Sequence, residues 1–336
     1  MQNRKEREES GDMEDTLARR AAEQPEKWEE PEISREARGG NCRLCPRMCG
    51  ADRRSAAAGF CGVPLAPVCA RAALHYWEEP CISGKTGSGA VFFSGCSLRC
   101  AYCQNADIAA ARHGLQITEE RLAQIYLELQ QKHAANINLV TAEQFLPSVV
   151  RSLRIARESG LTIPAVYNSG GYERPEALEC LRGLVSVFLP DCKYRSPELS
   201  ARYSAAPDYP ERSAEALKKM AELAGPLRYD DQGMIVSGMI VRHLVLPGNV
   251  RESEKVIRYL YETFGDSIAI SILRQYTPMP GIEARFPELG RRVTRREYEK
   301  VVDFALDLGV TNGFVQDAKT AKESFIPAFD LTGVLS

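Results

Sequence analysis

The feature that most constrains the fold is an alternation of strand-like and helix-like runs, which continues from Ser88 nearly to the end of the chain. Short runs rich in β-branched and apolar residues are separated by longer runs of helical periodicity, a pattern typical of βαβ units. The expected strands cover residues 89–94, 137–141, 163–168, 185–189, 239–246, 268–276 and 313–316. The expected helices cover residues 119–133, 147–159, 214–223, 252–264 and 295–308.

A series of about six or seven such units predicts an α/β fold in which parallel strands are joined by crossover helices. The favoured architecture is a partial or full parallel (β/α) barrel, with a doubly wound open sheet as the alternative. The chain lacks both the G-x-G-x-x-G fingerprint and the P-loop, which argues against a dehydrogenase or a nucleotide hydrolase. In a barrel, the active site lies at the carboxyl ends of the strands.

Three cysteines follow the first of these strands in the run Cys96-Ser-Leu-Arg-Cys100-Ala-Tyr-Cys103. A cluster of four irons normally takes four cysteines, so three on one loop leave one iron free to bind a substrate or cofactor. A structural zinc site with a distant fourth ligand, or reduced cysteines that bind nothing, are the alternatives. Zinc ligands usually come as C-x2-C pairs, which this triplet fits poorly.

A second group of four cysteines precedes the triplet, at Cys42, Cys45, Cys49 and Cys61. Four thiolates on turn-forming sequence satisfy either zinc or a fully ligated iron-sulfur cluster, and the sequence alone does not separate the two. Cys69 and Cys81 are isolated and are not assigned as ligands.

Composition bounds the partners and the compartment. The formal charge of −2 over 336 residues gives no overall field for nucleic acid or for an anionic membrane. No apolar run reaches the roughly 18 residues that span a bilayer, and the N-terminus carries no secretory signal. We therefore expect a cytoplasmic protein, in which the eleven cysteines are metal ligands and buried thiols more often than disulfides.

The expected organisation has three parts. Residues 1–38 are dense in charge and poor in large apolar side chains, so they are expected to be a disordered or loosely helical tail. Residues 39–87 form a cysteine-rich metal-binding segment, and residues 88–336 form the barrel.

Polar residues cluster where the expected strands end. They lie in Tyr167-Asn-Ser-Gly-Gly-Tyr172, in Asp191-Cys-Lys193, in Arg242-His243 and in Arg274-Gln-Tyr276. Each has a plain structural interpretation as a strand-end hydrogen bond or a turn, but four groups at matching positions favour a site. His243 is expected to be packed or hydrogen-bonded, and Gly170 and Gly171 to serve a backbone turn.

The chain resembles the radical S-adenosylmethionine (SAM) enzymes, and within them proteins like the pyruvate formate-lyase-activating enzymes, which activate glycyl radical enzymes. The likeness runs from about Asn41 to Asp330 and is carried by the motifs CRLCPRMCG, GFCG, ARAALHYWEEPCISG, FFSGCSLRCAYCQN, YNSGGYE, LPDCKY, IVRHLVLPGN and FIPAFD.

This resemblance implies a barrel of the radical SAM type, in which Cys96, Cys100 and Cys103 hold a 4Fe-4S cluster and SAM chelates the fourth iron. It places Tyr102, Asn168, Asp191, Lys193 and Arg242 around SAM. The activating enzymes usually carry Gly-Gly-Glu after the second barrel strand, whereas this chain has Val140-Thr141-Ala-Glu143, so whether Thr141 or Glu143 substitutes is open.

The implied reaction is the reductive cleavage of SAM to methionine and a 5′-deoxyadenosyl radical, which abstracts hydrogen from a target. The implied partners are a one-electron reductant such as ferredoxin or flavodoxin and a target, which is a protein in true activating enzymes and a small molecule or another polypeptide in the alternative. A non-catalytic iron-sulfur electron carrier and a zinc-stapled binding protein are the alternatives from other functional classes.

Overall fold

The computed structural model describes residues 29–54, 59–316 and 327–335. Residues 1–28, most of the predicted charged tail, lie outside the described residues. The last part of that predicted tail forms the helix α2 (Glu32–Arg38), in which Ile33, Ser34 and Ala37 are buried. From Glu32 onward the chain forms one compact unit.

The core of this unit is one sheet, whose strands are mostly parallel. The parallel strands are β2 (Ser88–Phe93), β4 (Ile137–Val140), β5 (Ala165–Ser169), β6 (Val187–Pro190), β8 (Ile235–Leu244), β9 (Ala269–Leu273) and β10 (Gly313–Val315). They lie in sequence order across the sheet, and this order never reverses. A doubly wound sheet requires such a reversal, so that alternative is excluded.

Three further strands are antiparallel. Strand β1 (Val68–His75) pairs with β2 and with the short β3 (Leu115–Gln116), while β7 (Arg228–Tyr229) forms a hairpin with β8. Among the described strands, β3 and β10 end the sheet and do not pair with each other. The predicted parallel α/β fold is confirmed, and in the described residues the barrel is partial.

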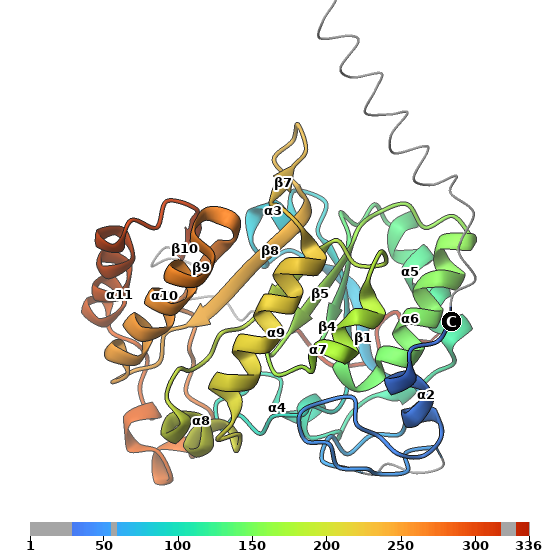
Figure 1. The fold of residues 1–336 in the computed structure, drawn as a ribbon, viewed down its shortest axis with the longest axis horizontal. Helices are drawn as coiled ribbons and strands as arrows, with labels where there is room; N and C mark the ends of the chain where they lie inside the picture. The colour runs from blue at the N-terminus through green and yellow to red at the C-terminus, as the bar shows by residue number, and fades with distance from the viewer. Residues whose placement is uncertain (1–28, 55–58, 317–326, 336) are drawn as a thin grey trace, which may run out of the picture. The chain divides into compact units, whose positions relative to one another are not determined.

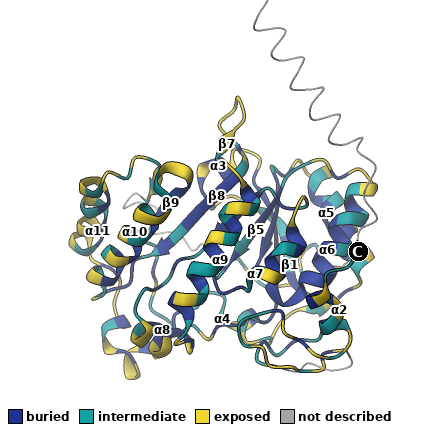
Figure 2. Ribbon diagram, in the orientation of Figure 1, coloured by how far each residue is buried: buried dark blue, intermediate teal, exposed yellow. Residues whose placement is uncertain are grey.

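Helices connect the parallel strands and cover the sheet. They are α5 (Glu119–Gln131), α6 (Leu146–Glu158), α7 (Pro175–Leu178), α8 (Pro197–Ser204), α9 (Tyr209–Ala224), α10 (Val250–Phe264) and α11 (Arg295–Leu308), and the short α3 (Pro80–Ser83) and α4 (Ala106–Ala109) lie in loops. Figure 1 shows α7 and α9 in front of the central strands. Every residue of β2, β4 and β6 is buried, as expected for strands covered on both faces (Figure 2).

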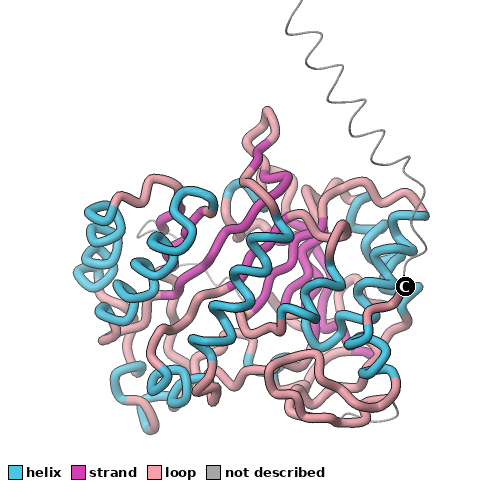
Figure 3. Tube along the Cα trace, in the orientation of Figure 1, coloured by secondary structure: helices cyan, strands magenta, loops and turns pink. Residues whose placement is uncertain are grey.

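The predicted cysteine-rich segment has little regular structure before β1. Residues 39–54 and 59–67 consist of turns and isolated bridges, and Figure 3 shows these residues as loop. Its anchor is Arg53, which is 1% exposed and donates to the carbonyls of Val63, Pro64 and Gln144 at 2.9, 2.8 and 2.9 Å. Gln144 follows β4, so Arg53 fixes this segment to the carboxyl end of the sheet.

The described C-terminal residues pair with the edge of β1. The amide of Ala72 donates to Thr332 and that of Leu331 donates to Ala70, at 2.8 and 3.0 Å. The ring of Phe329 packs edge-on against Phe92 of β2. This segment therefore lies along β1, and it places Pro327 beside the carboxyl ends of the strands.

Candidate functional site

The loop after β2 carries Cys96, Cys100 and Cys103 and holds them next to one another. Burial, followed by the nearby Cys100 thiol, raises the pKa of Cys103 to about 12. Burial also raises the pKa of Cys96, with Glu143 and Cys100 as further causes. The thiols lie close enough for their charges to interact, so this loop brings together the three cysteines that its spacing singled out.

The end of α8 fixes the conformation of this loop. The backbone amides of Arg99 and Ala101 donate to the carbonyls of Ser204 and Tyr203 at 3.1 and 2.7 Å. The Ser204 hydroxyl also donates to Cys100 Sγ at 3.0 Å. Tyr102 is buried and its hydroxyl lies 2.6 Å from that of Tyr194. The cysteines are thus held by contacts that come from a distant part of the chain.

The turn after β4 is the second support of the loop. Glu143 is 4% exposed and accepts a hydrogen bond from the backbone amide of Ser97 at 3.0 Å. Thr141, at the first position of this turn, has φ of 59°, which is strained for a β-branched residue. A glycine would adopt this conformation freely. Thr141-Ala-Glu143 therefore forms a sharp turn that binds the cysteine loop through Glu143.

A cavity of about 230 Å³ lies at the carboxyl ends of the strands, beside the cysteine loop. Seven of the residues that the sequence analysis proposed for the cluster and for SAM line it: Cys100, Tyr102, Cys103, Asn168, Asp191, Lys193 and Arg242. They come from the loop after β2, from β5 and β8, and from the residues just after β6. Neither Thr141 nor Glu143 is among its lining residues.

Asp191 and Lys193 form an ion pair in this cavity. Burial opposes the charge of Lys193, but Asp191 and Cys100 raise its pKa well above the ordinary value. Gly171 has φ of 71°, and a Cβ there would lie 2.0 Å from the carbonyl oxygen of Asp191. The expected turning role of Gly171 is therefore supported, since the Asp191 backbone packs directly against it.

Arg242 binds two glutamates that the sequence analysis did not single out. Its Nε lies 2.9 Å from Glu79 Oε1, its Nη2 lies 2.5 Å from Glu79 Oε2, and Nη2 also forms an ion pair with Glu78. Glu78 lines the cavity and accepts from Asn138 Nδ2 at 2.9 Å. Burial opposes the charge of Glu79, but Arg242 lowers its pKa below the ordinary value. The Glu-Glu pair in the motif ARAALHYWEEPCISG was the available signal.

A pair of buried carboxyl groups lies behind the cysteine loop. Burial, followed by repulsion from Glu143, raises the pKa of Glu173 well above its ordinary value, and burial raises the pKa of Glu143. Neither oxygen of Glu173 has a hydrogen-bond partner within normal distance among the described residues, although Glu143 and Ser169 lie close enough to affect its pKa. This pair holds a proton more tightly than exposed glutamates do.

The N-terminal cysteine group lies next to the same carboxyl groups. Burial raises the pKa of Cys45, followed by the effect of Glu143, and Cys42 and Cys61 contribute to it. Arg53 Nη1 donates to Cys42 Sγ at 3.3 Å. Cys49 is exposed, and a Cβ on Gly59 would lie 2.9 Å from its sulfur, so this position requires glycine. All four cysteines thus belong to one small segment.

Within the described ranges, no three His, Cys, Asp or Glu side chains converge on a single ion position. The three ligands of an iron-sulfur cluster bind different irons and need not converge in this way. The three neighbouring thiols on one anchored loop therefore fit a 4Fe-4S cluster, and the adjoining cavity offers polar groups of both charges for SAM. Metal binding by the N-terminal four cysteines stays a prediction.

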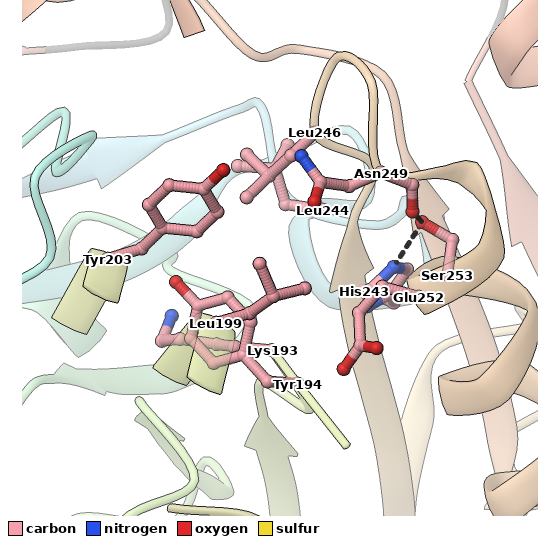
Figure 4. A pocket seen from close by; sticks show the side chains of 10 residues that line it. All are labelled: Lys193, Tyr194, Leu199, Tyr203, His243, Leu244, Leu246, Asn249, Glu252 and Ser253. Carbon is pink, nitrogen blue, oxygen red and sulfur yellow. Dashed lines mark hydrogen bonds between the residues drawn. The ribbon is translucent and has the colours of Figure 1, made fainter. Parts of the chain in front are cut away.

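Two strand-end residues have other roles. His243 is 2% exposed, and its ring nitrogens lie 2.8 Å from the Cys192 carbonyl and 2.9 Å from the Ser253 hydroxyl, as Figure 4 shows for Ser253. The space beside it is only about 10 Å³, near the lower limit for one water. The packed role expected for His243 is confirmed. Arg274 stacks over Tyr298, while its neighbour Gln275 lines the cavity beside the cysteine loop.

One family model matches the part of the chain that carries the cysteine loop. Residues 82–178, which include all three loop cysteines, match the family model of the 4Fe-4S single cluster domain. An uncharacterized protein of Methanocaldococcus jannaschii is 26% identical over 273 residues, covering 79% of this chain and 74% of that protein. The family match agrees with the resemblance drawn from the motifs.

Two solved structures show distant likeness. SuiB of Streptococcus suis, bound to S-adenosylmethionine, is 13% identical, with 68% of this chain and 47% of SuiB covered and a TM-score of 0.46. A domain of the pyruvate-formate lyase-activating enzyme of Bacteroides vulgatus is 12% identical, with 51% and 91% covered and a TM-score of 0.38. The chain thus spans less than half of SuiB.

No described helix is long and apolar enough to cross a membrane.

Proposed function

We propose that this chain is a radical SAM enzyme, with the cluster on Cys96, Cys100 and Cys103 and with SAM in the adjoining cavity. The observation that carries the proposal is that Cys100 and Cys103 line the same cavity as Asn168 and Lys193, although these residues come from separate strand ends. Cys96, Cys100 and Cys103 would hold the cluster, which in its reduced form would supply the electron for the cleavage of SAM to methionine and a 5′-deoxyadenosyl radical.

The residues of the chain bind and orient SAM. Lys193 lines the cavity together with Cys100 and Cys103, and Cys100 contributes to its raised pKa, so we assign it to the carboxylate of SAM. Asp191 keeps Lys193 charged. Arg242 forms ion pairs with Glu78 and Glu79. We therefore assign it to fixing the positions of these two carboxylates beside SAM, and not to binding SAM by itself.

Glu143 has the role of a support for the loop. It binds the Ser97 amide and does not line the cavity, so we assign it to fixing the cysteines and not to direct contact with SAM. We propose that Thr141-Ala-Glu143 takes the place of the missing Gly-Gly-Glu motif as a turn, and the strained φ of Thr141 at its first position supports this.

The target and the reductant follow from the resemblance. We propose a polypeptide target, of which a glycyl radical enzyme is one case, and a ferredoxin or flavodoxin as electron donor. Both are tested only after SAM cleavage has been established.

The test is product formation. The protein is purified anaerobically, reconstituted with iron and sulfide, reduced with dithionite and given SAM, and 5′-deoxyadenosine is measured by chromatography. We expect formation by the wild type and by Cys180→Ala, a buried cysteine outside the loop, and loss in Cys100→Ala. Cluster binding without 5′-deoxyadenosine would contradict the proposal and favour an electron carrier.

A further inference from the structure

The lining of the cavity beside the cysteine loop, together with the groups packed against it, carries more negative than positive charge. Glu78 follows β1 and lines the cavity, and Glu79 lies directly behind it against Arg242. The side chains of Glu78, Glu79 and Arg242 are 9%, 4% and 12% exposed. One guanidinium therefore faces two carboxylates in a place that is largely removed from water.

The other charged groups of the cavity do not offset this excess. Asp191 and Lys193 neutralise each other as an ion pair. His75 also lines the cavity, but burial lowers its pKa below the ordinary value, so its ring is neutral near pH 7. The two described cations, Lys193 and Arg242, thus face three carboxylates, which leaves one negative charge.

Of the two glutamates beside Arg242, Glu78 is the one that a ligand in the cavity can contact. It lines the cavity whereas Glu79 does not, and its carboxylate accepts hydrogen bonds from Arg242, from Asn138 at 2.9 Å and from Asn168 at 3.4 Å. An unbalanced charge in a partly buried site is costly, and a ligand of opposite charge relieves that cost. The cavity is therefore suited to a ligand with a positive centre.

We propose that Glu78 makes this cavity selective for the positively charged sulfonium of SAM over the neutral thioether of S-adenosylhomocysteine. The inference rests on the proposed function, because it takes SAM as the ligand of this cavity. Its consequence is that the enzyme binds its intact cofactor in preference to an adenosyl thioether of nearly the same shape, and that Glu78 is a specificity-determining residue.

The test is a set of binding measurements that do not depend on turnover. The anaerobically reconstituted wild type is titrated calorimetrically, without reductant, with SAM, S-adenosylhomocysteine and sinefungin, in which an amine carries the positive charge in place of the sulfonium. We expect the dissociation constants of SAM and sinefungin to be lower than that of S-adenosylhomocysteine by about tenfold or more. The attraction between two unit charges at an effective dielectric constant of about 20 is large enough for this difference.

Variants assign the preference to one residue. Glu78→Gln should reduce the preference for SAM about tenfold, whereas Glu78→Asp, which keeps the charge, and Glu176→Gln, an exposed glutamate outside the cavity, should retain it. Circular dichroism and iron content check that each variant is folded and loaded.

Each outcome decides the inference. Equal binding of the three ligands by the wild type overturns the inference. A Glu78→Gln protein that keeps the wild-type preference for SAM also overturns it. Binding of none of the three overturns the proposed function, and the inference with it. Equal binding of all three leaves the proposed function standing, so the two failures are distinguishable.

Discussion

The carboxylate of Glu143 accepts a hydrogen bond from the backbone amide of Ser97 at 3.0 Å, and this contact joins the turn after β4 to the cysteine loop after β2. Replacing Glu143 by Ala leaves the buried Ser97 amide without its acceptor, which costs about 1–3 kcal/mol. We expect Glu143→Ala to lower the free energy of unfolding by that amount and to lower iron content after reconstitution.

Glu143→Gln is the matched control, because the amide oxygen of glutamine still accepts from the Ser97 amide. It should keep most of the iron that the wild type binds. Equal iron content in Glu143→Ala and the wild type would show that this contact does not support the loop.

The buried carboxyl of Glu173 predicts a pH dependence of stability. Burial and Glu143 raise its pKa, so the folded state holds this proton more tightly than the unfolded chain does. The resulting stabilisation is complete below the ordinary value of 4.5 and is lost as the pH rises toward the raised pKa of the folded state. Urea denaturation under anaerobic conditions, between about pH 5 and pH 8, measures this loss.

Glu173→Gln carries no titratable proton at this position. Its free energy of unfolding should therefore fall less over the same pH range than that of the wild type. Parallel curves for the two proteins would refute the assignment of the proton to this carboxyl pair.

The Glu78, Glu79 and Arg242 group predicts a large effect on stability. In Arg242→Gln two buried carboxylates lose their counter-ion, which typically costs about 3–5 kcal/mol. Chemical denaturation should show this loss, whereas Arg112→Gln, which breaks an ion pair whose side chains are 69% and 59% exposed, should change stability by about 0–1 kcal/mol. A loss for Arg242→Gln no greater than that of the control would contradict the buried geometry.

The N-terminal cysteine group predicts a second metal centre. A triple variant with Cys96, Cys100 and Cys103 replaced by Ala removes the loop ligands and leaves the four N-terminal cysteines intact. We expect this variant to retain one metal centre per chain, and elemental analysis for iron and zinc identifies it. A metal-free triple variant would remove the prediction of a second site.

Much of the fold could be predicted from hydrophobic patterning alone. The helix expected at 147–159 is α6, Leu146–Glu158, and the strand expected at 89–94 is β2, Ser88–Phe93. These elements are predictable because buried parallel strands read as continuous apolar runs and their helices as amphipathic ones. By contrast β1 was not predicted, because Val68–His75 is an antiparallel strand that mixes small and charged residues.

The site was predictable where side chains follow parallel strands, since such strand ends meet at one edge. Asn168, Asp191 and Lys193 were found in this way, and all three line the cavity. Glu78 follows the antiparallel β1, so no rule about parallel strands placed it there. Its role depends on Arg242, which lies 164 residues away in the sequence, and contacts of that range are set by tertiary packing.

The most direct test of the central claim is electron paramagnetic resonance of the dithionite-reduced protein, recorded with and without SAM. If the three cysteines hold a 4Fe-4S cluster with an open iron, the wild type shows the signal of a reduced cluster, and SAM shifts that signal. The same signal should be lost in a variant with Cys96, Cys100 and Cys103 replaced by Ala. A wild-type signal that SAM does not change, or one that survives intact and SAM-responsive in that variant, would contradict the account.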